Sequence, residues 1–266
     1  KANDDVRKQF KIQQFESQFY EMLKLHRANI DEMDINNKLV GRKCFVRMFY
    51  EFKYIYLSLF NLHKAHNVNF NWNFNKEEFC NISYLVFFYG IGSISNRVVL
   101  KRLDEKYHPL TLLLIDYLEE GAVNEWNNSA NDYVEIAIDN EDGQTVFVFE
   151  MFYYPFDGHN SRLGHYFRHL YQTVSFVVNS DVINERSTQY KYLKLLRAQL
   201  SNHEQLLLYY NSLTKFGNGW LENKFFTDYK MIKNIPLDFA DFGVLPGELL
   251  GHTNDLGELI FEWDEY

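Results

Sequence analysis

Long stretches of helical periodicity with few helix breakers constrain this chain more than any other feature. In residues 4–34 the apolar and aromatic side chains recur every three or four positions, with charges between them: Phe15, Phe19, Met22, His26, Ile30 and Met33. The 266 residues include only 4 Pro and 13 Gly, which disfavours a turn-rich all-β fold. The sequence therefore predicts a mainly α-helical protein with one long leading helix over 4–34.

Further helices are predicted before and after one segment in which the spacing of apolar residues changes from helical to strand-like. Gly41 ends the leading pattern, and helical spacing returns at about 45–59, 77–90, 95–101, 110–120, 161–178 and 188–214. Between these blocks, Val134, Ile136 and Ile138 alternate with polar residues, and residues 139–143 (DNEDG) are a turn signal. We expect a helical bundle with an inserted acidic β-hairpin at about 133–152, as a minor α+β component.

Acidic and basic residues are distributed very unevenly. Residues 107–161 hold 11 acids and residues 237–266 hold eight, and neither segment has a Lys or Arg. The rest of the chain carries all 27 bases against 17 of the 36 acids, although the net charge is −9. We predict four parts: an N-terminal helical part (1–106), an acidic segment (107–158), a C-terminal helical part (159–236) and an acidic irregular tail (237–266). Because the helical parts are net basic, an anionic partner such as RNA stays compatible with this chain.

Composition and motifs exclude several classes of protein. With 46% apolar residues the chain can fill a core, so global disorder is excluded. Two cysteines, Cys44 and Cys80, cannot form a disulfide scaffold and lack metal-ligand spacing. The longest apolar stretch, residues 82–92, is about half of the ~20 residues that a membrane span needs. Because the chain opens with Lys1 rather than Met, we expect segments upstream of Lys1, which can anchor it to a membrane. No cofactor is predicted.

The predicted helix at 161–178 carries the most distinctive chemistry. At about 100° per residue its apolar side chains fall on one arc. The opposite arc holds Arg162, His165, Arg168, His169 and Gln172. A polar helix face made of Arg and His, rather than Lys and Glu, is unusual. Arg162, His165, Arg168 and His169 are therefore the candidate catalytic residues.

Three interpretations of this face differ in class. The first is structural pairing with acids of a neighbouring element. The second is a metal site, since His165 and His169 are four residues apart, but no carboxylate shares the face and the H-E-x-x-H pattern is absent, so no metal is predicted. The third is RNA cleavage, in which His transfers protons and Arg stabilises the charge on the reacting phosphate. The spacing Arg162-x6-His169 resembles the R-x4-6-H motif of HEPN ribonucleases, helical bundles that often dimerise to assemble their site.

The helical pattern at 188–214 supplies further polar candidates. In an unbroken helix, leucines would share a face with Arg197, Glu204 and Asn211 at seven-residue spacing. Polar groups within a leucine seam must be paired, so Arg197 and Glu204 are expected to form a buried network or to orient His165 or His169. Ser201-x-x-Glu204 is also a capping-box pattern, which would start a new helix at Asn202.

Two of these segments carry a family resemblance. LGHYFRHLYQTV (163–174) and LRAQLSNHEQLLLYYNSL (196–213) resemble the paired signatures of the AbiC-like phage abortive infection family. The segment FESQFYEMLKLHRANI (15–30), Gly41-Arg42 and residues 87–90 (FFYG) are similar to its N-terminal half. By position, the distinctive residues here are Gly164, His165, Tyr166, Phe167, Arg168, Leu170, Tyr171, Arg197, Gln199, Leu200, Glu204 and Asn211. The family signature stresses His165 and Arg168, whereas the HEPN spacing stresses Arg162 and His169.

The resemblance implies bacterial antiphage defence, in which an infected cell shuts down before phage release. It makes the polar signature residues Arg197, Gln199, Glu204 and Asn211 candidate binding residues. Members commonly carry transmembrane helices ahead of the segment at 15–30, which implies a cytoplasmic domain tethered to the inner membrane. Two functions fit: an RNA-cleaving effector, or a non-enzymatic membrane-linked sensor or oligomerising module that binds a phage protein, a nucleotide or a second subunit. Expected partners are RNA or a phage-derived trigger, and further copies in a homo-oligomer.

Overall fold

The computed structural model describes residues 2–70, 72–130, 132–139 and 143–265. Within these residues the β structure consists of two small antiparallel pairs and one isolated bridge between Thr253 and Leu259, and helices form most of the rest. In chain order the elements are α1 (Ala2–Asp31), β1 (Asp34–Ile35), β2 (Leu39–Val40), α2 (Arg42–Phe70), α3 (Lys76–Tyr89), α4 (Ser93–Arg102), η1 (Glu105–Tyr107), α5 (His108–Leu118), η2 (Glu119–Val123), α6 (Asn124–Asn128), β3 (Val134–Asp139), β4 (Thr145–Met151), α7 (Asn160–Val178), α8 (Arg186–Arg197), α9 (Asn202–Ser212), α10 (Gly219–Glu222), α11 (Pro246–Leu250) and η3 (Glu262–Glu265).

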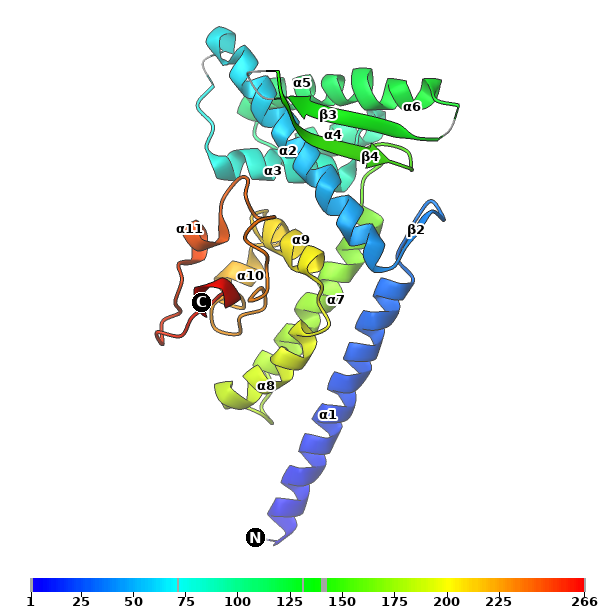
Figure 1. The fold of residues 1–266 in the computed structure, drawn as a ribbon. Helices are drawn as coiled ribbons and strands as arrows, with labels where there is room; N and C mark the ends of the chain where they lie inside the picture. The colour runs from blue at the N-terminus through cyan, green and yellow to red at the C-terminus, as the bar shows by residue number, and fades with distance from the viewer. Residues whose placement is uncertain (1, 71, 131, 140–142, 266) are drawn as a thin grey trace.

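The two longest helices, α1 and α2, meet at a sharp corner. After α1 the chain makes the small β1–β2 hairpin, whose turn holds Asn36 and Asn37 at φ 55° and 56°. Gly41, at φ 61°, then leads into α2. Asn and Gly adopt this left-handed conformation at low cost, so the break expected at Gly41 is local in origin. Figure 1 shows the N-terminal end of α1 extending away from the rest of the protein, whereas the later part of this helix lies beside α7.

The core is built around α2, which contacts α3, α5, α9 and the β3–β4 hairpin. The hairpin lies across α2 with Val134, Ile136 and Ile138 buried and the intervening residues exposed. This alternation is what a strand with one buried face requires. The predicted class, a helical bundle with an inserted acidic hairpin, is therefore confirmed. Residues 140–142 of the predicted turn lie outside the described residues.

The helix predicted over 188–214 is two helices. α8 ends at Arg197 and α9 starts at Asn202, because Ser201 and Glu204 form a complete capping box. The Ser201 side chain accepts from the Glu204 N–H, and the Glu204 carboxylate accepts from the Ser201 N–H. The shared leucine face expected for an unbroken helix is wrong for this reason.

The acidic C-terminal segment contributes to the core despite its irregular backbone. Phe242 stacks on Tyr210 with ring centroids 4.7 Å apart, and both rings are buried. The Tyr209 and Tyr210 hydroxyls donate to the carbonyls of Val244 and Phe242. These bonds satisfy buried polar groups of both partners, so this segment closes the core over α9.

Candidate functional site

The start of α7 is fixed by a close backbone crossing. The N–H of His159 donates to the carbonyl of Phe88, at the end of α3, over 2.9 Å. Gly90 and Gly158 lie at this crossing with φ of 76° and 87°. A Cβ on either glycine would come within 2.6 Å of the opposite backbone. The position of the first turn of α7 therefore depends on two residues that lack a side chain.

The four candidate catalytic residues lie on α7 but face three different environments. Arg162 and His165 line a cavity of about 360 Å³ between α7 and the end of α1. This α1–α7 cavity is also lined by Asn29, Glu32, Asp34 and Ser161. Arg168 lines a separate pocket beside α3 and α9, and His169 packs against His26 of α1. Within the part of the chain that the structure describes, no group of three or more His, Cys, Asp or Glu could hold a metal ion.

The Arg162 guanidinium donates hydrogen bonds to main-chain carbonyls. Its Nε donates to the carbonyl of Asp34 over 2.6 Å, and its Nη1 donates to the carbonyl of Gly158 over 3.2 Å. These bonds tie the first turn of α7 to the chain that follows α1. Arg162 therefore holds two segments together, but through main-chain carbonyls and not through the acidic side chains expected in the structural interpretation.

His26 and His169 form a contact inside the α1–α7 interface. Their ring centroids are 6.3 Å apart in an edge-on arrangement. His26 is fully buried, and neither of its nitrogens has a hydrogen-bond partner among the described residues; the same holds for Nε2 of His169. Burial, with smaller contributions from His169, Arg42 and Arg27, lowers the pKa of His26 to about 4. Burial also lowers the pKa of His169. Both rings are thus neutral at pH 7.

Acidification is expected to destabilise the protein through His26. The unfolded chain binds a proton at His26 below its ordinary pKa of about 6.5, whereas the folded protein does so only below about 4. Stability is therefore lost as the pH falls between these values, by about 2 kcal/mol from pH 7 to pH 5. Urea unfolding at each pH measures this slope. His26→Phe should flatten it, and an unchanged slope in that variant would contradict the assignment to His26.

Glu204, a candidate binding residue, is a buried structural centre. Its carboxylate accepts from the Tyr166 hydroxyl and from the Ser201 N–H, both over 2.7 Å. Arg42 lies at 3.4 Å and completes an ion pair on the more exposed side. Apart from the capping bond with Ser201, the contacts of this buried carboxylate join α9 to α7 and to the start of α2. Glu204 therefore connects helices, and it is not among the described residues that line the pocket beside Arg168 or the α1–α7 cavity.

The other signature residues of the α8–α9 junction also form hydrogen bonds with other parts of this chain. Gln199 accepts from Arg27 of α1 over 2.8 Å, and its carbonyl accepts from Arg42 of α2. Arg197 is buried and donates to the carbonyl of Lys230 over 2.8 Å. The expected pairing of Arg197 with Glu204 is wrong, because the helix break places the two residues on different helices with different partners.

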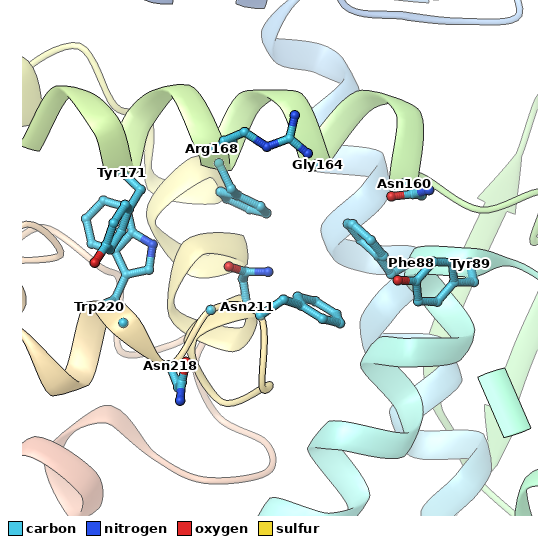
Figure 2. A pocket seen from close by; sticks show the side chains of 13 residues that line it. Phe88, Tyr89, Asn160, Gly164, Arg168, Tyr171, Asn211, Asn218 and Trp220 are labelled. Carbon is cyan, nitrogen blue, oxygen red and sulfur yellow. The ribbon is translucent and has the colours of Figure 1, made fainter. Parts of the chain in front are cut away.

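Asn211 and Arg168, by contrast, are brought together. With Gly164 and Tyr171, two more residues of the family signature, they line a pocket of about 460 Å³, which we call the α7 pocket. Figure 2 shows α7 above it, α3 on one side with Phe88 and Tyr89, and the loop after α9 below. Arg168 extends along α7 toward Gly164 (Figure 2). The pocket therefore collects residues from three separate parts of the sequence.

Aromatic rings form much of the wall of the α7 pocket. Phe216 stacks on Phe88 with centroids 5.1 Å apart, and Tyr171 meets Trp220 edge-on at 5.6 Å. Gly219 lies under the Tyr171 ring, which a Cβ would approach to 3.1 Å. These contacts bring residues 216–220 close to α7, so the pocket is largely preformed.

Several lining residues of the α7 pocket are not among the candidates predicted from the sequence, including Asn160, Phe216, Asn218 and Trp220. The glycines of Phe216-Gly-Asn-Gly-Trp220 are the one local sign of a tight loop after α9. Nothing in the sequence indicates that this loop faces α7, because that contact joins residues about 50 positions apart.

Arg168 is the group of this pocket that is best placed to bind a charged ligand. Its side chain is exposed and makes no hydrogen bond or ion pair with any other residue that the structure describes. Arginine stays charged throughout the physiological pH range and presents several N–H donors in one plane. Beside aromatic walls, such a group favours an anionic ligand with an apolar or aromatic part.

Comparison with known proteins gives one family match, which includes most of the residues that line this pocket. Residues 158–240 match the family described as putative phage abortive infection protein. Searches among curated proteins and among solved structures gave no match. No helix within the described residues is both long and apolar enough to cross a membrane. All pocket residues except Phe88 and Tyr89 lie inside the matched segment. The segment from α7 to the start of the C-terminal tail is therefore similar to the phage abortive infection family.

Proposed function

We propose that this protein acts in bacterial abortive infection as a sensor whose α7 pocket binds an anionic ligand. The family match supports the role in phage defence. The observation that carries the sensor function is Arg168, a cation without a protein partner among the described residues, on the wall of an aromatic pocket. Unpaired guanidinium groups at concave sites are typical of carboxylate or phosphate recognition.

The chemistry of the pocket favours binding over catalysis. Apart from Arg168, its polar groups are three amides, two tyrosine hydroxyls and one indole N–H, from Asn160, Asn211, Asn218, Tyr89, Tyr171 and Trp220. Among the lining residues that the structure describes, none is a His, Cys, Asp or Glu. Amides donate and accept hydrogen bonds, a guanidinium only donates them, and neither group shuttles protons near neutral pH. A ligand bound here would be recognised rather than converted.

Replacing Arg168 tests this function directly. Arg168→Ala should abolish phage protection in a plaque assay while its melting temperature stays within about 2 °C of the wild type, because the side chain is exposed and makes no described bond. Arg97→Ala, which removes an exposed arginine from α4, is the matched control and should protect fully. Full protection by Arg168→Ala would overturn the sensor proposal.

RNA cleavage is the second candidate function. Its supporting observation is that Arg162 and the exposed His165 line the same α1–α7 cavity. His165 could transfer a proton there, although two Arg162 nitrogens already donate to carbonyls. This hypothesis predicts that purified protein degrades RNA and that His165→Ala slows the reaction at least a hundredfold. Equal RNA stability with wild type, His165→Ala and buffer would rule it out.

Two further parts of the proposal rest on the sequence resemblances, the first to HEPN ribonucleases and the second to the abortive infection family. We propose that the protein works as a homo-oligomer and that it acts next to the inner membrane. Sedimentation of the purified protein and fractionation of cells expressing the full-length gene product would test these two parts.

A further inference from the structure

We propose that the anionic ligand of the α7 pocket is a mononucleotide, with its base on the Phe216 ring and its phosphate on Arg168. This inference rests on the sensor function proposed above and narrows its ligand to one chemical class. It follows from four properties of the pocket: a supported aromatic surface, amide groups at the wall, one cation, and a limited volume.

Phe216 offers a stacking surface that is already held in place. One side of its ring stacks on Phe88 at 5.1 Å with an interplanar angle of 27°, yet the residue is 46% exposed and lines the pocket. Phe88 stacks in turn on Tyr84, which is fully buried and accepts a hydrogen bond from Asn211. A ring supported in this way loses little freedom when a base stacks on it, and stacking is favourable for every base.

Two amide side chains can read the edge of a base. Asn160 makes no hydrogen bond with its side chain to another described residue, and its Oδ1 lies over Gly164, only 3.3 Å from where a Cβ would be. Asn218 donates one N–H to Glu222 and keeps its carbonyl oxygen. An amide pairs with the donor and acceptor groups of base edges, which a purely apolar ligand would leave unsatisfied.

Volume and charge limit the ligand to one nucleotide. A pocket of about 460 Å³ lies in the lower part of the range of roughly 300–1,000 Å³ found for small-molecule sites. An acidic peptide or a nucleic acid strand would place several charges near the pocket, whereas Arg168 is the single Lys or Arg among the lining residues that the structure describes. One guanidinium, several rings and amide groups at the wall match one phosphate attached to one base.

Calorimetric titration of the full protein with the 5′-monophosphates of adenosine, guanosine, cytidine and uridine tests this inference. Ribose 5-phosphate and the four nucleosides are the partial ligands. At least one mononucleotide should bind, and ribose 5-phosphate should bind at least tenfold more weakly. Arg168→Ala should weaken the nucleotide about tenfold or more and leave its nucleoside unchanged. Phe216→Ala and Phe216→Leu should weaken both, and Phe10→Ala, an exposed phenylalanine of α1, should weaken neither.

The failures of the two proposals are distinguishable. If ribose 5-phosphate binds as tightly as the nucleotides, the base contributes nothing and the nucleotide inference is overturned, while an anionic ligand remains. If no mononucleotide binds although Arg168→Ala abolishes phage protection, the nucleotide inference is overturned and the sensor proposal stands. If Arg168→Ala protects fully, the sensor proposal itself fails, and the nucleotide inference fails with it.

Discussion

Gly158→Ala is expected to lower the free energy of unfolding by about 3 to 5 kcal/mol. The backbone at Gly158 has φ of 87°, which an alanine adopts only with strain. A Cβ there would lie 2.6 Å from the carbonyl carbon of Tyr89, and the nearby atoms are backbone that cannot rotate away. The substitution must therefore push α7 away from the end of α3. Because the α7 pocket lies between these helices, ligand binding should be lost with the stability.

A matched glycine separates the two causes of this effect. Gly257 has a similar φ of 74°, but a Cβ there would meet nothing within 4 Å. Gly257→Ala should therefore lower the free energy of unfolding only through backbone strain, by about 1 to 2 kcal/mol. Urea unfolding followed by circular dichroism measures both variants. Equal midpoints for the two would show that the crossing of α3 and α7 is not the cause.

Glu204→Ala is expected to cost a comparable amount, about 3 to 5 kcal/mol. The substitution leaves the buried Tyr166 hydroxyl without its acceptor and removes one half of the capping box that starts α9. It also leaves Arg42 without its carboxylate partner at 3.4 Å, although exposure of the Arg42 side chain reduces that part of the loss. Thermal and urea unfolding measure the total.

Two other substitutions identify the origin of the Glu204 effect. Glu204→Gln keeps an acceptor for Tyr166 and should lose less than half as much stability. Glu248→Ala removes the exposed capping glutamate of the five-residue helix α11 and should cost less than about 1 kcal/mol. If Glu204→Ala lowers the free energy of unfolding no more than Glu248→Ala does, the buried contacts of Glu204 do not contribute the stability that we infer.

Several features of the fold follow from the local sequence alone. The amphipathic pattern of 161–178 gives α7, because both its helical spacing and its apolar face are encoded within 19 adjacent residues. The alternation at 134–138 gives β3 for the same reason. The break between α8 and α9 is also local, since Ser201 and Glu204 are only three residues apart, and the capping pattern outweighed the leucine spacing.

The roles of individual polar residues could not be assigned in this way. Arg162 and Arg168 lie on the same helix and look alike in the sequence, yet the first is bonded to carbonyls and the second has no described partner. Glu204 and Asn211 lie on the same helix as well, but the first is enclosed by Tyr166 and Arg42 while the second reaches the α7 pocket. The difference lies in neighbours that are more than 30 residues away in the chain.

The sequence by itself determined the helical class, the acidic hairpin, the amphipathic helix α7 and the resemblance to the abortive infection family, since these depend on spacing within short segments. Only the tertiary structure decided which signature residues face a pocket. It placed the end of α3 and the loop at 216–220 against α7, and it divided one Arg- and His-rich face among three environments. The physical reason is that a helix fixes the direction of its side chains, whereas long-range packing fixes what they meet.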